Sequence, residues 1–173
     1  HYASAYNVVP VLRTLVEAGA PLEARTDVGA TPLFSAVYGA QGPDVVGYLI
    51  DAGSDPATSD VYDQSAIFAG IMNAAPAESI TIMLENGAGS SRLPPGHGTL
   101  LHLLVANYPN RPDLVRLALD SGVDPNETFG DGITPLMMAS ALTSEPEMVF
   151  ALLDGGADPS LRTGTGETAW EFA

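Results

Sequence analysis

Apolar residues recur along the chain in short stretches with helical spacing. In one stretch they lie at Val45, Val46, Leu49 and Ile50, which places them on one face of an amphipathic helix. Such stretches begin at a Pro with an acidic residue close behind and end at a Gly. Pro fits the first helical turn, the helix dipole favours the acid there, and Gly suits the left-handed position after a helix. The pattern therefore predicts a short helix in front of each such Gly.

The same Gly recurs at a nearly constant interval. Its positions are Gly19, Gly53, Gly87, Gly122 and Gly156, at intervals of 34, 34, 35 and 34 residues. A hydroxyl residue keeps the same register at Thr31, Ser65, Thr99, Thr134 and Thr168. A hydroxyl side chain caps the N-terminus of a helix, so each repeat is predicted to hold two helices and a polar loop. One repeat cannot bury both of its apolar faces, so the copies are expected to stack into a solenoid.

Two motifs connect these repeats to a known family. Residues 29–36 and 132–139 read GATPLFSA and GITPLMMA, and the second helices end as LIDAGSD at 49–55 and LLDGGAD at 152–158. The chain resembles the ankyrin-repeat family over essentially its whole length. The resemblance implies an all-α solenoid of about five stacked helix-turn-helix repeats with projecting loops or short hairpins. A single domain over 1–173 is expected, with approximate repeats 1–26, 27–60, 61–94, 95–129 and 130–163 and a partial repeat 164–173.

The sequence departs from the family pattern in three ways. The interval is 34 or 35 rather than 33, while the distance from the periodic Gly to the next hydroxyl stays at 12. The extra residues are therefore expected between the two helices of a repeat, around 41–43 and 108–112. The family His is kept at His102 and replaced elsewhere by Phe34, Phe68, Met137 and Glu171. Residues 1–5 and 168–173 match parts of first helices, which suggests the repeat portion of a longer protein.

The net charge of the chain limits the classes of partner that it is expected to bind. The chain has 21 acidic residues against six Arg, which gives a formal charge of −15. Such a surface repels nucleic acids and anionic membranes and attracts a cationic protein. The alternative is that the acidity serves solubility alone. The absence of Cys excludes disulfides, thiolate metal sites and Cys nucleophiles.

No residue pattern points to catalysis. His102 is interpreted as the structural His of its repeat. The Asp124-x-Asn126 segment starts like a calcium loop, but Phe129 and Pro135 stand where such a loop needs Gly and Glu. The carboxylates that recur once per repeat are typical of a solvated helix face. We therefore expect no enzyme activity, metal or cofactor.

In the ankyrin family the concave surface is formed by loop tips and first helices. Carried over to this sequence, the expected partner-binding residues are Asp27, Val28, Tyr38, Asp60, Val61, Tyr62, Asp63, Met72, Asn73, Asn107, Phe129 and Asp131. The alternative for Tyr38 and Met72 is packing against neighbouring helices. Phe129 either extends this surface or shields the stack.

The sequence predicts a non-catalytic protein-interaction module for a basic partner. Two alternatives stay open. One is a dedicated acidic inhibitor or immunity-type protein that neutralises one basic enzyme, with charge accelerating the encounter. The other is a targeting module of a larger enzyme.

Overall fold

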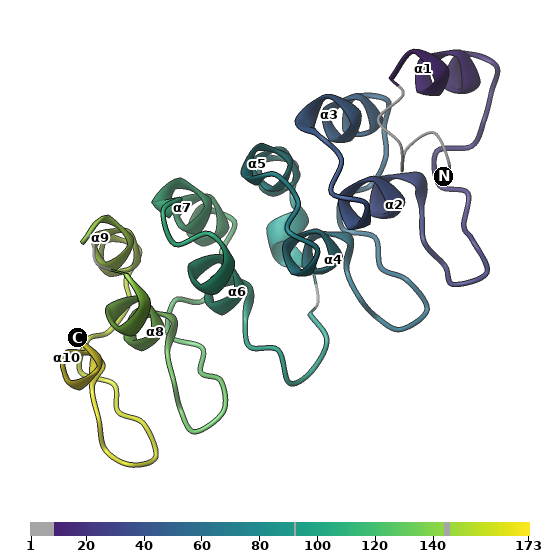
Figure 1. Cartoon of the computed structure of the whole chain (residues 1–173). Coiled ribbons are helices and arrows are strands. Elements are labelled where there is room, and N and C mark those ends of the chain that lie inside the picture. Colours follow the sequence, from purple (N-terminus) through teal and green to yellow (C-terminus); the bar gives the residue numbers. More distant parts are fainter. Residues whose placement is uncertain (1–8, 92, 144–145) are drawn as a thin grey trace. The chain divides into compact units, whose positions relative to one another are not determined.

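The computed structural model describes residues 9–91, 93–143 and 146–173, and its regular elements in these ranges are helices (Figure 1). They are α1 (Val9–Glu17), α2 (Pro32–Tyr38), α3 (Pro43–Asp51), α4 (Ala66–Met72), α5 (Ala77–Glu85), the 3-10 helix η2 (Ala88–Ser90), α6 (Leu100–Asn107), α7 (Pro112–Asp120), α8 (Pro135–Leu142), α9 (Glu147–Asp154) and α10 (Ala169–Phe172). The all-α prediction is confirmed. Residues 1–5, predicted to match a first helix, lie outside the described ranges.

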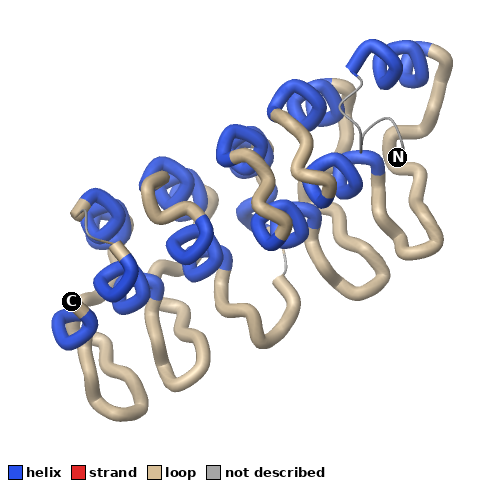
Figure 2. Tube along the Cα trace, viewed as in Figure 1, coloured by secondary structure: helices blue, strands red, loops and turns tan. Residues whose placement is uncertain are grey.

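The chain forms two compact units, the N-terminal unit of residues 1–94 and the C-terminal unit of residues 95–173. In the N-terminal unit α2 packs on α4, while α3 packs on α5 and contacts α1. In the C-terminal unit α8 lies between α6 and α10, and α7 packs on α9. First helices thus stack on first helices and second helices on second, and the loops of each unit project beyond its first helices (Figure 2).

The periodic hydroxyl residues cap the first helices as predicted. Thr31 Oγ1 accepts a hydrogen bond from Phe34 N at 3.1 Å, and Thr134 Oγ1 accepts one from Met137 N at 3.2 Å. The last cap also uses the side chain three residues on, because Thr168 N donates to a Glu171 carboxylate oxygen at 2.7 Å. A carboxylate therefore takes over, in that repeat, the capping role of the family His.

The five periodic Gly share one backbone role. Gly19, Gly53, Gly87, Gly122 and Gly156 have φ between +87° and +106°. A Cβ at any of them would meet no other atom within 4 Å. The left-handed backbone at the end of each second helix, rather than lack of space, is what favours Gly there.

The described linkers between the two helices of a repeat are each four residues long. Residues 39–42, 73–76 and 108–111 each join a first helix to its second helix. Ala40 and Ala74, which are 34 residues apart, both have positive φ, +50° and +54°. Gln41 N and Ala75 N donate to carbonyls five residues back, so Ala occupies the left-handed position directly after the C-cap, where Gly is usual.

Small residues let the stacked first helices approach closely, as the sequence predicted. Ala36 and Ala69 are buried in α2 and α4. A Cβ on Gly70 would lie 3.2 Å from Val37 Cβ and 3.3 Å from Ile80 Cδ1. The second helices bury the face expected from their spacing, with Val45, Val46 and Leu49 inaccessible to solvent.

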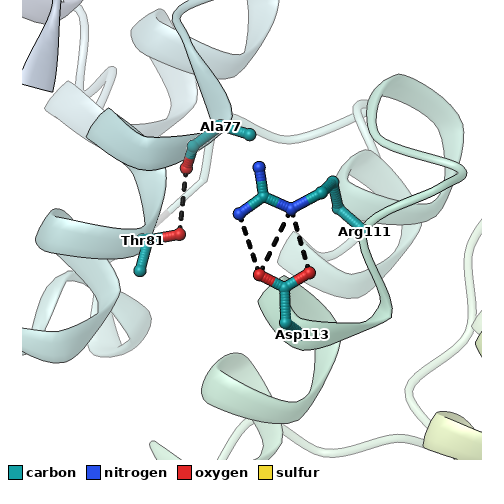
Figure 3. Close-up of polar contacts among 4 residues, drawn as sticks. All are labelled: Ala77, Thr81, Arg111 and Asp113. Carbon is teal, nitrogen blue, oxygen red and sulfur yellow. Dashed lines mark hydrogen bonds and ion pairs between the residues drawn. The ribbon is translucent and has the colours of Figure 1, made fainter.

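Local polar contacts fix two of the second helices (Figure 3). At the start of α7, Arg111 Nη2 lies 2.9 Å from Asp113 Oδ2, and Arg111 Nε lies 3.0 Å from Asp113 Oδ1. This bond from Arg111 holds the pKa of the Asp113 carboxyl below its usual value. In α5, Thr81 Oγ1 donates to Ala77 O at 3.0 Å.

Among the described residues no helix is long and apolar enough to span a bilayer.

Candidate functional site

A groove of about 570 Å³ opens in the N-terminal unit between α2 and the tips of two loops. The first loop tip lies around Val28, and the second lies around Asp60 and Tyr62. Its walls are formed by Val28, Ala30, Phe34, Ser35, Tyr38, Gly39, Asp60, Tyr62 and Gln64. Four residues predicted from the sequence line it, namely Val28, Tyr38, Asp60 and Tyr62. The structure thus brings together side chains from two successive repeats in one concave feature.

The second loop tip presents Tyr62 on a closed hairpin. Asp60 N donates to Gln64 O at 3.0 Å, and Asp60 Oδ1 accepts from Tyr62 N at 2.8 Å and from Gln64 N at 3.0 Å. Asp63 follows with a left-handed φ of +61°. These bonds fix the backbone at Tyr62, and 68% of the residue is exposed.

A clamp joins the second tip to the first. Val61 N donates to Val28 O at 3.0 Å. One guanidinium nitrogen of Arg25 donates to Gly29 O at 2.9 Å and to Ser59 O at 2.7 Å. Gly29 has φ +77°, and a Cβ there would lie 2.9 Å from Val61 Cγ1 and 3.0 Å from Val61 N. Gly is therefore required at position 29 by both its backbone and its surroundings.

Tyr38 forms the α2 wall of the groove. Its ring stacks on Phe34, with centroids 6.3 Å apart and planes 16° from parallel. Phe34 is buried, whereas Tyr38 remains 56% exposed. Tyr38 thus rests on its own helix and still presents its ring to solvent. Met72, the repeat equivalent of Tyr38, is similarly exposed but does not line the groove.

The charge around the groove is predominantly negative. Asp60 is the charged residue among the nine that line it. Asp27 and Asp63 are exposed on the same two loops. Arg25 is the cation on these loops, and its guanidinium bonds to the backbone carbonyls of the clamp. The groove therefore combines aromatic walls with an acidic rim.

The other predicted residues have local structural roles in the described structure. Asn73 and Asn107 are repeat equivalents whose amides donate to carbonyls four residues back, at 2.8 Å and 2.9 Å. Phe129 is half-buried with its ring edge against His102, 6.0 Å between centroids, which matches the shielding alternative. Asp131 is exposed, and its carbonyl accepts from Gly164 N at 2.7 Å. Asn107, Phe129 and Asp131 belong to the C-terminal unit and lie outside the groove.

His102 links two repeats. Its Nδ1 lies 3.2 Å from Thr99 N and 2.8 Å from Thr99 Oγ1, and its Nε2 lies 3.0 Å from Ile133 O of the next repeat. These partners fit a neutral ring with the proton on Nε2, because the backbone N–H of Thr99 needs an acceptor. Burial lowers the pKa of His102, against smaller raising effects of the Ile133 carbonyl and Glu127. His102 is a structural residue, as predicted, and it reaches beyond its own repeat.

The described residues offer no group of three His, Asp or Glu side chains arranged for a metal. Asp124, which suggested the start of a calcium loop, accepts Asn126 N at 2.8 Å on Oδ1 and so closes a turn. Asn126 in turn donates to Gly156 O and accepts from Asp158 N, which ties its loop to the next repeat. These carboxylates and amides stabilise the loops.

Comparison with known proteins agrees with this architecture. The family described as ankyrin repeats in many copies matches residues 100–153. A solved ankyrin repeat domain from Acinetobacter baumannii superimposes with a TM-score of 0.80 at 26% identity, over 100% of this chain and 88% of that one. The chain is built of ankyrin repeats. Proteins of this repeat architecture use their extended surfaces to bind partners.

Other relatives match parts of the chain or its fold. The rice (Oryza sativa subsp. japonica) BTB/POZ domain and ankyrin repeat-containing protein NH5.1 is 41% identical over 68 residues, which is 38% of this chain and 13% of the relative. Regulatory protein NPR6 of Arabidopsis thaliana is 38% identical over 68 residues, 39% of this chain and 15% of the relative. The chain thus matches a small part of the length of these curated relatives. A chain from the complex of a predatory Bdellovibrio bacteriovorus endopeptidase with an immunity protein shares the fold, with a TM-score of 0.72 at 18% identity over 99% of this chain and 88% of that one.

Proposed function

We propose that this ankyrin-repeat chain binds a basic protein partner without catalysing a reaction, and that the N-terminal unit carries the contact surface. The observation that supports this most directly is the groove, where Tyr38 and Tyr62 stand exposed beside Asp60. Exposed aromatic residues at a concave feature are typical binding hot spots.

The proposed surface extends beyond the groove along the same loops and first helices. It comprises Asp27, Val28, Tyr38, Asp60, Val61, Tyr62, Asp63, Met72 and Asn73. Val61 is 63% exposed and Met72 is 50% exposed, so both add apolar area to the proposed surface. Apolar anchors with an acidic rim favour a partner whose binding face carries Lys or Arg around apolar residues.

The charge of the chain supports the basic character of the partner. A formal charge of −15 raises the encounter rate with a cation and suppresses encounters with acidic proteins. A surface contact of this kind weakens with salt, because the screening length falls to about 3 Å at 1 M ionic strength. The dissociation constant should therefore rise steeply with added NaCl. A dissociation constant that does not respond to salt would contradict a basic partner.

A dedicated inhibitor or immunity-type function is the second candidate, because the same acidity would accelerate capture of one basic enzyme. A chain of this fold occurs in a complex between an endopeptidase and an immunity protein, although at 18% identity that likeness extends to the fold alone. Capture of one basic enzyme together with loss of its activity on binding would favour this candidate. A targeting module of a larger enzyme is the third reading, and a catalytic domain in the parent reading frame would favour it.

The test is affinity capture with the intact chain and with a triple variant, Tyr38→Ala, Tyr62→Ala and Met72→Ala. We expect the partner captured by the intact chain to be lost from the triple variant. The control replaces two apolar residues that are exposed elsewhere, Val11→Ala in α1 and Phe150→Ala in α9, and should keep the partner. Circular dichroism verifies that both variants are folded. Retention of the same partner by the folded triple variant would refute the proposed surface.

A further inference from the structure

We propose that the groove of the N-terminal unit receives an arginine side chain of the partner, with its guanidinium against the tyrosine rings and paired with Asp60. This inference rests on the proposed function and specifies the chemistry of its central contact. It assigns separate roles to the apolar walls, the carboxylate and the loop clamp.

The walls match the stem and the flat face of arginine. Tyr38, supported from behind by Phe34, presents its ring from α2, and Tyr62 presents its ring from the second loop tip. Val28 and Ala30 add aliphatic surface at the first loop. A guanidinium is planar and weakly hydrated, and it stacks on aromatic rings, whereas an ammonium is compact and strongly hydrated. The walls therefore favour arginine over lysine.

Asp60 supplies the counter-charge in a fixed position. Its Oδ1 accepts the two backbone N–H groups of Tyr62 and Gln64, so the carboxylate is held by the hairpin. Both bonds use Oδ1, and Oδ2 is the oxygen that an incoming guanidinium meets. Two other repeats show that an uncharged oxygen can make the same bond to the hairpin backbone. Thr26 Oγ1 accepts Ala30 N at 3.1 Å, and Thr163 Oγ1 accepts Glu167 N at 3.2 Å, at the equivalent positions.

The clamp makes the groove rigid before a partner arrives. Arg25 and the backbone bond from Val61 to Val28 hold together the two loops whose residues line the groove. A volume of about 570 Å³ falls within the range of ligand pockets, so residues flanking the arginine also have room. Binding should consequently require little reordering of the loops.

The experiment titrates the intact chain with short blocked peptides and follows backbone amide shifts by NMR. The probe is acetyl-Gly-Ser-Arg-Ser-Gly-amide, compared with the same peptide carrying citrulline, a neutral isostere, or Lys. We expect shifts at Gly39, Tyr62 and Gln64 and at least about tenfold weaker binding of the citrulline peptide, because a charge-assisted bond is lost. Lys should bind less tightly than Arg. Equal affinities for arginine and citrulline would overturn the inference.

Matched variants separate the local pair from the overall charge. Asp60→Asn keeps an Oδ1 acceptor for the hairpin, and Asp60→Thr reproduces the residue found in two other repeats. The control Asp63→Asn removes the same charge from the same loop outside the groove, at a positive φ that Asn tolerates. We expect Asp60→Asn to weaken the arginine peptide about tenfold and Asp63→Asn to weaken it less than twofold. Equal losses in the two variants would overturn the assigned contact.

A second matched pair tests the aromatic wall. Tyr38→Leu should weaken the arginine peptide several-fold and narrow its advantage over the lysine peptide, while Met72→Leu, at the equivalent position of the next repeat, should change neither. If the peptide fails to bind but the triple variant still loses the partner, the arginine contact is wrong and the proposed function stands. If the peptide binds as expected but the triple variant keeps its partner, the proposed function fails independently.

Discussion

Replacing His102 by Met tests how the repeats are joined, because the next repeat already carries Met137 at the same position. In the unsubstituted chain, called the parent below, His102 is hydrogen-bonded both to Thr99 and to the carbonyl of Ile133 in the following repeat. In the Met137 repeat the equivalent contact is a long bond of 3.4 Å from Thr134 N to the sulfur. The substitution therefore keeps a buried side chain at the cap and removes the link between repeats.

The expected loss follows from the bonds involved. The His102 ring makes three hydrogen bonds. Each intramolecular hydrogen bond contributes about 0.5–1.5 kcal/mol net to the free energy of unfolding, which limits the expected loss. Ile133 O still accepts from Phe129 N at 2.9 Å, and Thr99 N keeps a weak sulfur acceptor, so the loss is partial. We expect His102→Met to lower the free energy of unfolding by about 1–3 kcal/mol, measured by urea denaturation at pH 8. Amide exchange should accelerate in residues 99–107 and 129–136 of the C-terminal unit.

The pH dependence provides the sharper test. Burial lowers the pKa of His102 below the usual 6.5 of a histidine, so below pH 6.5 the unfolded chain binds more protons at this residue than the folded chain. Stability due to the neutral ring is thus complete above that pH and falls as the pH drops towards the folded pKa. The parent should lose stability as the pH falls below about 6.5, and His102→Met should lose less. Identical pH profiles for the parent and His102→Met would refute this account of the ring.

Five further substitutions, arranged as three tests, are measured by denaturant unfolding. Gly53→Ala should destabilise by about 1–2 kcal/mol because φ is +106°, whereas Gly42→Ala, at φ −65° with open space around it, should change stability by less than about 1 kcal/mol. Ala40→Gly should stabilise the protein by less than about 1 kcal/mol, because Gly adopts the positive φ of this position without strain. Ala36→Gly, in the buried face of α2, should destabilise it by at least about 1 kcal/mol. Effects of the same sign in the two variants would contradict this difference between the positions. Asp113→Asn should destabilise the protein by about 0.2–1 kcal/mol near neutral pH. Because the Asp113 carboxyl has a lowered pKa in the folded chain, this difference should disappear as the pH falls below 3.8. A loss of stability that persists in acid would show that the Arg111–Asp113 ion pair does not cause it.

The repeat register could be predicted from the sequence because its determinants are local. A Gly after a helix needs only its own left-handed backbone, and a hydroxyl cap needs only the N–H three residues on. Gly53 and Thr31 therefore have the roles that their spacing indicates. For Tyr38 the sequence left both exposure and packing against a neighbouring helix open, and in the structure the residue is 56% exposed.

The clamp and the groove could not be predicted, because they depend on residues that meet only when repeats stack. Arg25 reaches Ser59, 34 residues on, and nothing in the local pattern distinguishes it from another surface cation. Gly29 could have signalled a close approach, since it precedes the cap in the TPL motif, but its neighbour Val61 lies in the next repeat. Phe129 shows the reverse case, where an apparent tip residue packs on the His102 ring.

The two units share a framework and differ in the chemistry placed on it. The backbone bond from Val61 to Val28 has its counterpart in the bond from Gly164 to Asp131, 103 residues on. At the positions of Tyr38, Asp60 and Tyr62, the last part of the C-terminal unit has Ala141, Thr163 and Thr165, and the repeat before it has Phe129 and Asp131 at the last two of these positions. Phe129, however, packs on the His102 ring. Because the stack constrains caps, helix ends and loop-to-loop bonds alike in both units, the repeats can differ at the tip side chains without loss of structure. The exposed Tyr38 and Tyr62 rings beside Asp60 therefore support the proposed role in recognition.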